Sequence, residues 1–322
     1  MSPQHRTRTV CVLGGSGFVG RSLCNQLVRG GYSVRVPTRN PARRRELLVL
    51  PGVDLLSADI SASGTLVSLL DGCAAVINLV GILNERGHDG SGFASVHVDL
   101  VENLAHACAE VGVERLIHVS ALKANAERGP SHYLRTKGRA EELIHRLCGD
   151  DIKFTIFRPS VIFGPDDSFI NRFAALLRRA PLLPVPQVGA RFAPVYVEDV
   201  AAAMIRALED SSTHNKTYEL CGPDIYTLGE ILQIILRQLE IRRLVLPMPA
   251  LLARVQAWIA DYLIPGKPFS LDNLRSLSVA SVCSENGFAA LGIEPTPLHA
   301  IVPSYVGPDL PRLAKLRQTT RR

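Results

Sequence analysis

The sequence predicts a doubly wound α/β fold, in which helices cover both faces of a parallel sheet, followed by a smaller, mostly helical C-terminal lobe. Short β-branched segments alternate with helix-length segments through the first half, a glycine-rich turn follows the first of them, and the alternation stops near residue 160. The 322 residues are 47% hydrophobic and 20% charged. This composition excludes a disordered, collagen-like or coiled-coil protein and provides enough apolar residues for a large core.

Six segments of the N-terminal half have the β-branched, apolar composition of buried strands. The segments between them are long enough for crossover helices, and residues 100–111 form an apolar-periodic stretch that stops at Gly112, as expected at a helix C-terminus. Strands separated by helices run parallel to one another. The predicted strands are residues 9–13, 33–36, 53–56, 75–80, 115–119 and 154–157.

The second half has few predicted strands and many short helices. Thr227 and Glu230 form a capping box that opens a helix, after a proline-rich segment at 181–186. We therefore predict a sheet domain of residues 1–160, which also takes strands from 190–222. The remaining residues, 161–322, form a smaller lobe that we expect to close over the carboxyl edge of the sheet.

Residues 244–264 form the most apolar long stretch and are numerous enough to span a bilayer. Two prolines near the start would break such a helix, and Arg254 and Asp261 would be costly at the bilayer centre. We predict a buried or interfacial helix with Trp258 in the core, and peripheral membrane contact as the alternative. The basic tail, residues 311–322, is interpreted as a solubilising end, although anionic lipid or an acidic partner would suit it.

The seven cysteines include no Cys-x-x-Cys pair and have no histidine at a zinc-ligand spacing. We interpret them as small buried hydrophobic residues of a reducing compartment, and predict no metal site. His97, His106 and His118 also lack metal-ligand spacing and are taken as structural. The first ten residues contain no signal-peptide apolar segment, so we expect a cytoplasmic location, with peripheral attachment to the inner face of a membrane as the alternative.

The net charge of +6 comes from 36 Lys and Arg against 30 Asp and Glu, and much of it lies in short clusters. A nucleic-acid-binding surface usually needs a broad basic face. We therefore expect no nucleic-acid partner.

A glycine-rich turn follows the first predicted strand directly and leads into a helix. Glycine is required where the turn is tight, where a pyrophosphate approaches the backbone, and where helix packs against strand. The helix N-terminus then offers N–H groups and a partial positive charge to the phosphates. The strand before the turn, the helix after it and the second strand make dinucleotide binding the predicted function of residues Gly14, Gly15, Ser16, Gly17, Phe18, Val19 and Gly20.

The end of the second strand bears on which dinucleotide is bound. An NAD-preferring site places Asp or Glu there, whereas this chain has Thr38 and Arg39, whose guanidinium suits a 2′-phosphate. We therefore predict NADP(H) over NAD(H), and interpret Arg43, Arg44 and Arg45 as a solvated helix face. Asp59 and Ile60 follow the third strand, where an adenine edge could be bound; Asp59 as a helix N-terminal carboxylate is the alternative.

These features resemble the short-chain dehydrogenase/reductase superfamily and its Rossmann fold, since Tyr133 and Lys137 form its Tyr-x-x-x-Lys pattern and the fourth strand ends in Val80-Gly81. The strings 118–122, 131–137 and 158–169 are similar to one atypical branch, the nucleotide-binding accessory subunits of respiratory complex I and their bacterial relatives. The resemblance covers nearly the whole chain. It implies firmly held NADPH, no established turnover, and Pro159 and Lys137 among the residues that bind the cofactor.

Tyr133 and Lys137 lie one helical turn apart, so both side chains reach the same face. A lysine ammonium beside a phenol lowers the tyrosine pKa, which would give a proton donor or acceptor next to a nicotinamide. Ser120 lies 13 residues before Tyr133 and suits the superfamily's hydroxyl partner by spacing. Extended members place that hydroxyl a residue or two later, where this chain has Ala121 and Leu122, and a leucine cannot hydrogen-bond a substrate oxygen.

Three hypotheses about function remain open. The first is a cofactor-binding accessory or scaffold protein with a respiratory or membrane-associated partner. The second is a reductase or epimerase that uses Tyr133 and Lys137, with Ser120, on a small carbonyl, quinone-related or sugar-nucleotide substrate. The third is a regulator that reports the NADPH/NADP⁺ ratio, which requires different affinities for the two forms.

Overall fold

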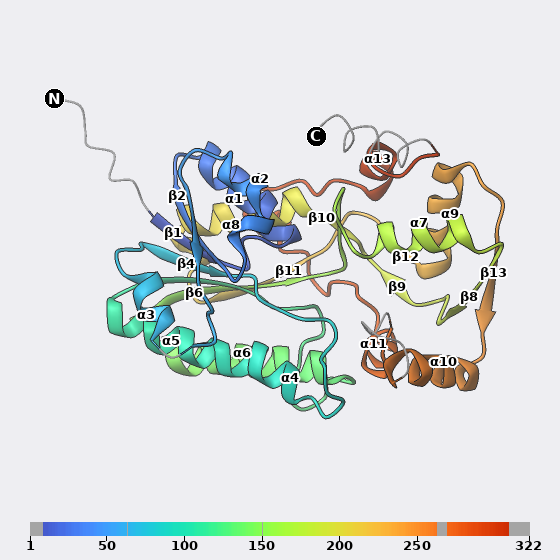
Figure 1. The fold of residues 1–322 in the computed structure, drawn as a ribbon, viewed down its shortest axis with the longest axis horizontal. Helices are drawn as coiled ribbons and strands as arrows, with labels where there is room; N and C mark the ends of the chain where they lie inside the picture. Colours follow the sequence, from blue (N-terminus) through green and yellow to red (C-terminus); the bar gives the residue numbers. More distant parts are fainter. Residues whose placement is uncertain (1–8, 63, 150, 263–268, 309–322) are drawn as a thin grey trace. The chain divides into compact units, whose positions relative to one another are not determined.

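The computed structural model describes residues 9–62, 64–149, 151–262 and 269–308 (Figure 1). The chain divides into two compact units, and it enters and leaves each of them more than once. The basic tail predicted at 311–322 lies outside the described residues. Unit 1 comprises Met1–Pro159, Glu198–Leu220 and Glu285–Ile293, and unit 2 comprises Ser160–Val197, Cys221–Ser284 and Glu294–Arg322.

Unit 1 contains a parallel sheet of seven strands in the order β11-β6-β5-β4-β1-β2-β3. The predicted doubly wound fold class and all six predicted strands are confirmed, and the seventh strand, β11, comes from residues after 200. The strands are β1 (Thr9–Leu13), β2 (Ser33–Thr38), β3 (Val53–Ser57), β4 (Ala75–Asn78), β5 (Arg115–Val119), β6 (Lys153–Pro159) and β11 (Lys216–Leu220).

Helices cover both faces of this sheet. Figure 1 shows α3, α5 and α6 along one face and α1 and α8 along the other. Apolar residues of α3, α5 and α6 form a buried cluster with residues of β1, β4, β5 and β6. The helical segments are α1 (Phe18–Arg29), η1 (Pro41–Arg43), α2 (Arg45–Leu48), α3 (Thr65–Leu70), α4 (Ser91–Ala94), η2 (Ser95–Asp99), α5 (Leu100–Val111), α6 (His132–Cys148), α8 (Val197–Glu209), η3 (Ser211–Thr213) and α12 (Phe288–Leu291).

Two of these helices end or begin as the sequence dictates. The predicted helix at 100–111 is confirmed as α5, and Gly112 follows it in the left-handed conformation at φ 73°. Ser131 caps α6, because its hydroxyl accepts a hydrogen bond from the Leu134 N–H. This cap fixes the start of the helix that carries Tyr133 and Lys137.

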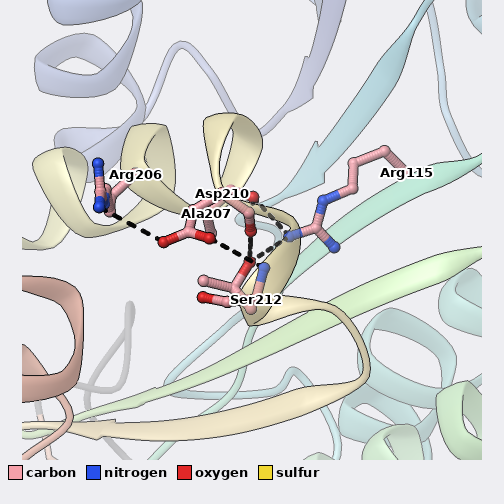
Figure 2. A network of polar contacts seen from close by, with 6 residues as sticks. Arg115, Arg206, Ala207, Asp210 and Ser212 are labelled. Atoms are coloured by element: carbon pink, nitrogen blue, oxygen red, sulfur yellow. Dashed lines mark hydrogen bonds and ion pairs between the residues drawn. The ribbon is translucent and has the colours of Figure 1, made fainter.

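Arg115, at the start of β5, holds the connection between α8 and β11 against the sheet (Figure 2). The buried guanidinium donates to four acceptors, namely the carbonyls of Lys153 and Ala207 and the hydroxyls of Thr155 and Thr213, at 2.6–3.1 Å. Burial lowers the pKa of Arg115 to about 10. The hydrogen bonds therefore replace water around a cation that remains charged at neutral pH.

Unit 2 combines helices with three two-stranded sheets. Its core lies largely between α7 and α9, and the predicted capping box of Thr227 and Glu230 is confirmed at the start of α9. The strands are β7 (Ile162–Phe163), β8 (Leu182–Pro186), β9 (Arg191–Phe192), β10 (Val195–Tyr196), β12 (Tyr226–Thr227) and β13 (Leu244–Met248). The helical segments are α7 (Ile170–Arg179), α9 (Leu228–Leu239), α10 (Ala250–Tyr262), α11 (Leu271–Ser276), α13 (Leu298–Ile301) and η4 (Val302–Ser304).

The apolar stretch at 244–264 begins as a strand, β13, and continues as α10, so the prediction of a single helix is wrong at its start. The prediction that Trp258 lies in the core is also wrong, since 49% of this residue is exposed. The alanines of α10, rather than its large side chains, face inward and pack near Leu274 of α11. No helix in the described ranges is long and apolar enough to cross a membrane.

The interpretation of every cysteine as a free thiol is corrected for two of them, because Cys221 and Cys283 form a disulfide. The segments next to the two cysteines both bond to the backbone of residues 191–193. The Gly222 N–H donates to the Ala193 carbonyl, and the Ser281 N–H donates to the Arg191 carbonyl. The 62 residues between the cysteines hide this proximity from sequence spacing. Each of the other five cysteines is free and buried, as predicted.

Candidate nucleotide-binding site

The glycine-rich turn lies where the strand order of the sheet reverses. β1 is paired with β2 on one side and with β4 on the other. Strands β2 and β3 are therefore added to one side of β1, and strands β4, β5 and β6 to the other. The carboxyl ends of β1 and β4 are joined by a hydrogen bond from the Leu79 N–H to the Leu13 carbonyl, 2.9 Å long. Ligands of doubly wound sheets bind in the crevice outside such a reversal.

Two glycines of the turn are required by geometry. Gly14 has φ of +81°, which side-chain-bearing residues rarely adopt, and a Cβ there would lie 3.2 Å from the Leu79 backbone. A Cβ on Gly20 would lie 2.5 Å from the Gly15 Cα, so only glycine lets the first turn of α1 pack on the loop. A side chain at Gly14 would therefore crowd the backbone just after β4, and a side chain at Gly20 would clash with the turn.

The N-terminus of α1 has no side-chain cap in the structure. Gly17 is the N-cap residue and has no side-chain oxygen to accept a helix N–H. Ser16 and Gly17 precede the helix, and Phe18, Val19 and Gly20 form its first turn, so the predicted residues are the ones that would offer backbone N–H groups. An anion is a natural partner for such an end.

The residues predicted to contact the adenosine half end two neighbouring strands. Thr38 ends β2, and its carbonyl accepts a hydrogen bond from the Ala58 N–H just past β3. Arg39 and Asp59 are exposed. Hydrogen bonds from the hydroxyl and the N–H of Ser61 lower the pKa of Asp59, and the charge of Arg39 makes a smaller contribution. Ile60 is partly exposed next to Asp59.

The end of β4 is organised by a buried pair, Asn78 and His118. The Asn78 side-chain amide lies 3.2 Å from His118 Nδ1, and the Asn78 Oδ1 accepts the Val80 N–H at 3.0 Å. Burial is the main cause that lowers the pKa of His118 well below its usual value, so its ring is neutral. This pair shapes the backbone that leads to Gly81.

Gly81 lies against Lys137. A Cβ on Gly81 would be 3.3 Å from Lys137 Nζ, and Nζ donates to the Val119 carbonyl at 2.9 Å. The structure thus brings together the ends of β4 and β5 with the Tyr133–Lys137 turn of α6. These segments are separated in the sequence by up to 56 residues, counted from Gly81 to Lys137.

Lys137 is 4% exposed, and burial lowers its pKa to about 8 although the Glu141 carboxylate opposes the shift. Glu141 is itself buried and bound to Arg158, whose Nε donates to both carboxylate oxygens at 2.9 and 3.1 Å. A second guanidinium nitrogen of Arg158 also contacts Glu141. The lysine therefore has a fixed anionic neighbour that favours its charged form.

The prediction that Lys137 lowers the pKa of Tyr133 is wrong. Burial raises the pKa of Tyr133 to about 12, so the phenol stays protonated at neutral pH. The cause of this shift is desolvation of the phenolate by burial. Tyr133 in this state can donate a proton but offers little phenolate to accept one.

Ser120 directly follows β5 and is 3% exposed. Its hydroxyl has no hydrogen-bond partner among the described residues, although its N–H donates to the Phe157 carbonyl. Ala121 and Leu122 are also buried, and the Leu122 N–H donates to the carbonyl of Pro159 at the end of β6. A buried hydroxyl without a partner costs stability, so a bound oxygen or nitrogen at this point would satisfy it.

One residue of the site escaped the sequence analysis. His97 is buried between Phe93 and Tyr133, and its two ring nitrogens contact Ile82 and Thr136, respectively 15 and 39 residues away. No motif or spacing in the sequence marks these contacts. The sequence shows only that His97 lacks a metal-ligand spacing.

These features fit a dinucleotide. The turn between β1 and α1 leaves no room for a side chain at Gly20, the helix end is uncapped, and the hydroxyl of Ser120 has no partner. A pyrophosphate at the α1 N-terminus would extend its two halves toward the ends of β2 and of β4, where the predicted residues lie.

Residues 10–221 match the NAD dependent epimerase/dehydratase family. The chain belongs to this family. It is 31% identical over 290 residues to NADH dehydrogenase [ubiquinone] 1 alpha subcomplex subunit 9, mitochondrial, of Arabidopsis thaliana, a match that covers 85% of this chain and 71% of the relative. The Mus musculus protein of the same name is 32% identical, with 89% of this chain and 76% of the relative covered.

The fold is shared with solved structures of low sequence identity. MoeE5, in complex with UDP-glucuronic acid and NAD, has a TM-score of 0.74 and 18% identity, and the match covers 95% of this chain and 99% of MoeE5. This likeness establishes the Rossmann-type fold. The sequence resemblance to the short-chain dehydrogenase/reductase superfamily and to complex I accessory subunits is confirmed by the family and its relatives.

The expected cytoplasmic location, with its alternative of attachment to the inner face of a membrane, is contradicted. The plant and mouse relatives are named as mitochondrial proteins. A missing apolar segment in the first ten residues was too weak an observation to assign a compartment, because not every targeting segment is apolar.

Proposed function

We propose that this protein is an NADP(H)-binding accessory subunit of a respiratory complex, in which the dinucleotide stabilises the fold and unit 2 contacts a protein partner. The similarity to subunits named as parts of NADH dehydrogenase carries the proposal. The fit of the β1–α1 turn to a pyrophosphate supports the cofactor. A ligand that binds only the folded state stabilises it by mass action, by about 2.7 kcal/mol at 100 times its Kd.

The preference for NADP(H) is supported by Arg39. No acid follows β2 to accept a ribose 2′-hydroxyl, whereas Arg39 lies exposed one residue past Thr38. A guanidinium can donate two parallel hydrogen bonds to a phosphate. Lys137 and the backbone around Val80 and Gly81 would hold the nicotinamide half, with Pro159 at the neighbouring strand end.

Titration of the purified protein with NADPH and with NADH, followed by nucleotide fluorescence and by melting temperature, tests this proposal. We expect NADPH to bind at least tenfold more tightly than NADH and to raise the melting temperature. Arg39→Gln should weaken NADPH binding by about tenfold or more, since a charge-assisted hydrogen bond contributes about 1.5–3 kcal/mol, and should leave NADH binding nearly unchanged.

Arg43→Gln, which changes an exposed arginine of η1, serves as the matched control and should alter neither affinity by more than about twofold. Equal dissociation constants for NADPH and NADH would contradict the cofactor preference. Failure to bind either nucleotide would contradict the proposed function itself.

A second function is favoured by the protonated Tyr133 and the unpartnered Ser120 hydroxyl. In a reductase, bound NADPH would supply hydride to a small carbonyl, Tyr133 would give its proton to the carbonyl oxygen, and Ser120 would hold that oxygen. Oxidation of NADPH by added quinone-related or sugar-nucleotide carbonyls would support this function. Tyr133→Phe should then abolish turnover while NADPH affinity changes by less than about threefold.

The same titrations address the regulator hypothesis. A sensor of the NADPH/NADP⁺ ratio must bind the two forms with markedly different affinities. Similar dissociation constants for NADPH and NADP⁺ would exclude it.

A further inference from the structure

His97, in η2, contacts the loop after β4 and helix α6, all within unit 1. It is 1% exposed within η2, its ring meets that of Tyr133 edge-on at 5.5 Å between centroids, and Phe93 packs at 5.7 Å. A ring enclosed in this way has little rotational freedom. Its two nitrogens therefore have fixed directions and fixed partners.

The hydrogen bonds of His97 define one tautomer. The Ile82 N–H donates to Nε2 at 3.2 Å, so Nε2 carries no proton and the proton of the neutral ring is on Nδ1. Nδ1 then donates to the Thr136 hydroxyl at 2.9 Å. The hydroxyl is in turn 2.8 Å from the His132 carbonyl, to which it can donate.

The result is a directional chain of hydrogen bonds from the loop after β4 to the first turn of α6. Each donor has its own acceptor, and the imidazole is the link that cannot be removed without separating the two ends. Burial, with a smaller contribution from the charge of Lys137, lowers the pKa of His97 to about 2. The neutral form is thus maintained, and a protonated ring would have no lone pair for the Ile82 N–H.

The loop that this chain fixes is the one that contains Gly81. A Cβ placed on Gly81 would lie 3.5 Å from His97 Nε2 and 3.3 Å from Lys137 Nζ, so the backbone rests directly on both side chains. Without the bond to Ile82, the loop would lose its anchor to α6. Its distance from Lys137 would then no longer be set by the fold.

We infer that His97 is a positioning residue for the nicotinamide half of the site: by linking the Ile82 N–H to Thr136, it holds the Gly81 backbone at the distance from Lys137 that admits the dinucleotide. This inference rests on the proposed function. His97 acts through the loop and does not itself need to touch the ligand.

Two substitutions separate the two hydrogen bonds. In His97→Gln the side-chain oxygen can reach the place of Nε2 and accept from Ile82, whereas in His97→Asn the shorter amide can replace Nδ1 and bond only to Thr136. His106→Gln, at an exposed position of α5, is the matched control. The probes are NADPH and adenosine 2′,5′-bisphosphate, which has the adenosine and 2′-phosphate but no nicotinamide.

We expect His106→Gln to bind each of the two probes with the affinity of wild type. His97→Asn and His97→Gln each keep one of the two hydrogen bonds and break the link, so both should bind NADPH at least tenfold more weakly and adenosine 2′,5′-bisphosphate within twofold of wild type. Unchanged NADPH affinity in both His97 variants would overturn the inference, as would an equal loss for both probes, which indicates a purely structural role.

If His97→Asn does not fold, Thr136→Val removes the other end of the chain with nearly the same side-chain volume. It should also weaken NADPH binding selectively, and unchanged binding would overturn the inference. A wild-type protein that binds neither probe refutes the proposed function, and the inference with it. Wild-type binding combined with unaffected variants refutes the inference alone.

Discussion

Lys137 shows at the level of one residue how a buried charge in the candidate site can reduce stability. Its ammonium is almost fully buried in α6, and burial lowers its pKa from 10.5 to about 8 despite the opposing Glu141 charge. Below pH 8 the folded protein must hold a charge that water would solvate better. The cost corresponds to roughly 3 kcal/mol for a shift of this size.

The first prediction concerns the pH dependence of this cost. Between pH 8 and about 10.5 an unfolded lysine is still protonated while folded Lys137 is not, so the unfolded state binds more protons and stability rises with pH. In Lys137→Met this rise is absent. The difference in free energy of unfolding, wild type minus Lys137→Met, should therefore increase by roughly 3 kcal/mol from pH 7 to pH 10.5.

Urea unfolding of both proteins across this range, without nucleotide, measures the difference. Thiols and phenols that titrate in the same range are common to both chains and cancel. A difference that stays constant or falls with pH would show that Lys137 is not buried as a charged group.

At the scale of elements, Arg115 explains how the seventh strand is joined to the sheet. β11 follows α8 and η3, and the four hydrogen bonds of the Arg115 guanidinium reach the end of α8, η3 and β6. Figure 2 shows the Arg115 guanidinium pointing at the connection after α8. Arg206 and Asp210 form an ion pair on the same connection, 3.5 Å long and more exposed. Both arginines contact the connection between α8 and β11, but Arg115 is buried and Arg206 is exposed.

The second prediction compares them. Arg115→Ala removes the four hydrogen bonds of a buried, charged guanidinium and should lower the free energy of unfolding by about 3 kcal/mol. Arg206→Ala removes an exposed i,i+4 pair and should lower it by no more than about 0.5 kcal/mol. Urea unfolding at neutral pH measures both, and similar losses in the two variants would contradict the role assigned to Arg115.

At the scale of the whole molecule, α10 has an unusual distribution of side chains. Alanines at 253, 257 and 260 face inward, and the large apolar side chains face solvent, with Leu251 73% exposed. The exposed residues follow the helical period on one face: Leu251, Leu252, Val255, Trp258, Ile259 and Tyr262. Apolar faces of this kind commonly mark surfaces that another molecule covers, which agrees with the proposed accessory subunit.

The third prediction tests this surface in the source organism. A chain with Leu251→Gln and Leu252→Gln should co-purify with respiratory-complex subunits at less than a tenth of the wild-type level. Its free energy of unfolding and its NADPH affinity should stay near those of wild type, because exposed side chains contribute little to folding. Leu48→Gln, at an exposed leucine of α2, is the control, and equal co-purification of both variants with wild type would contradict the prediction.

Part of this structure could be predicted from local sequence. Six of the seven strands of the sheet were predicted to within two residues at each end, because a strand buried on both faces needs a continuous β-branched run. The turn at Gly14 and the cap at Thr227 were also found, since each depends on residues within a few positions. The division into a sheet domain of 1–160 and a lobe of 161–322, and the site residues themselves, stay predictions.

Other features could not be predicted, because each depends on residues far apart in the chain. The pKa of Tyr133 is raised because packing around α6 buries its phenol. The alanines of α10 face inward because they pack near Leu274 of α11. The sequence by itself determined the succession of strands and helices along the chain and the position of the glycine turn, because local composition and backbone geometry control both. Only the tertiary structure decided the Cys221–Cys283 pairing, the exposure of Trp258 and the tautomer of His97, because packing alone chooses the neighbours of a side chain.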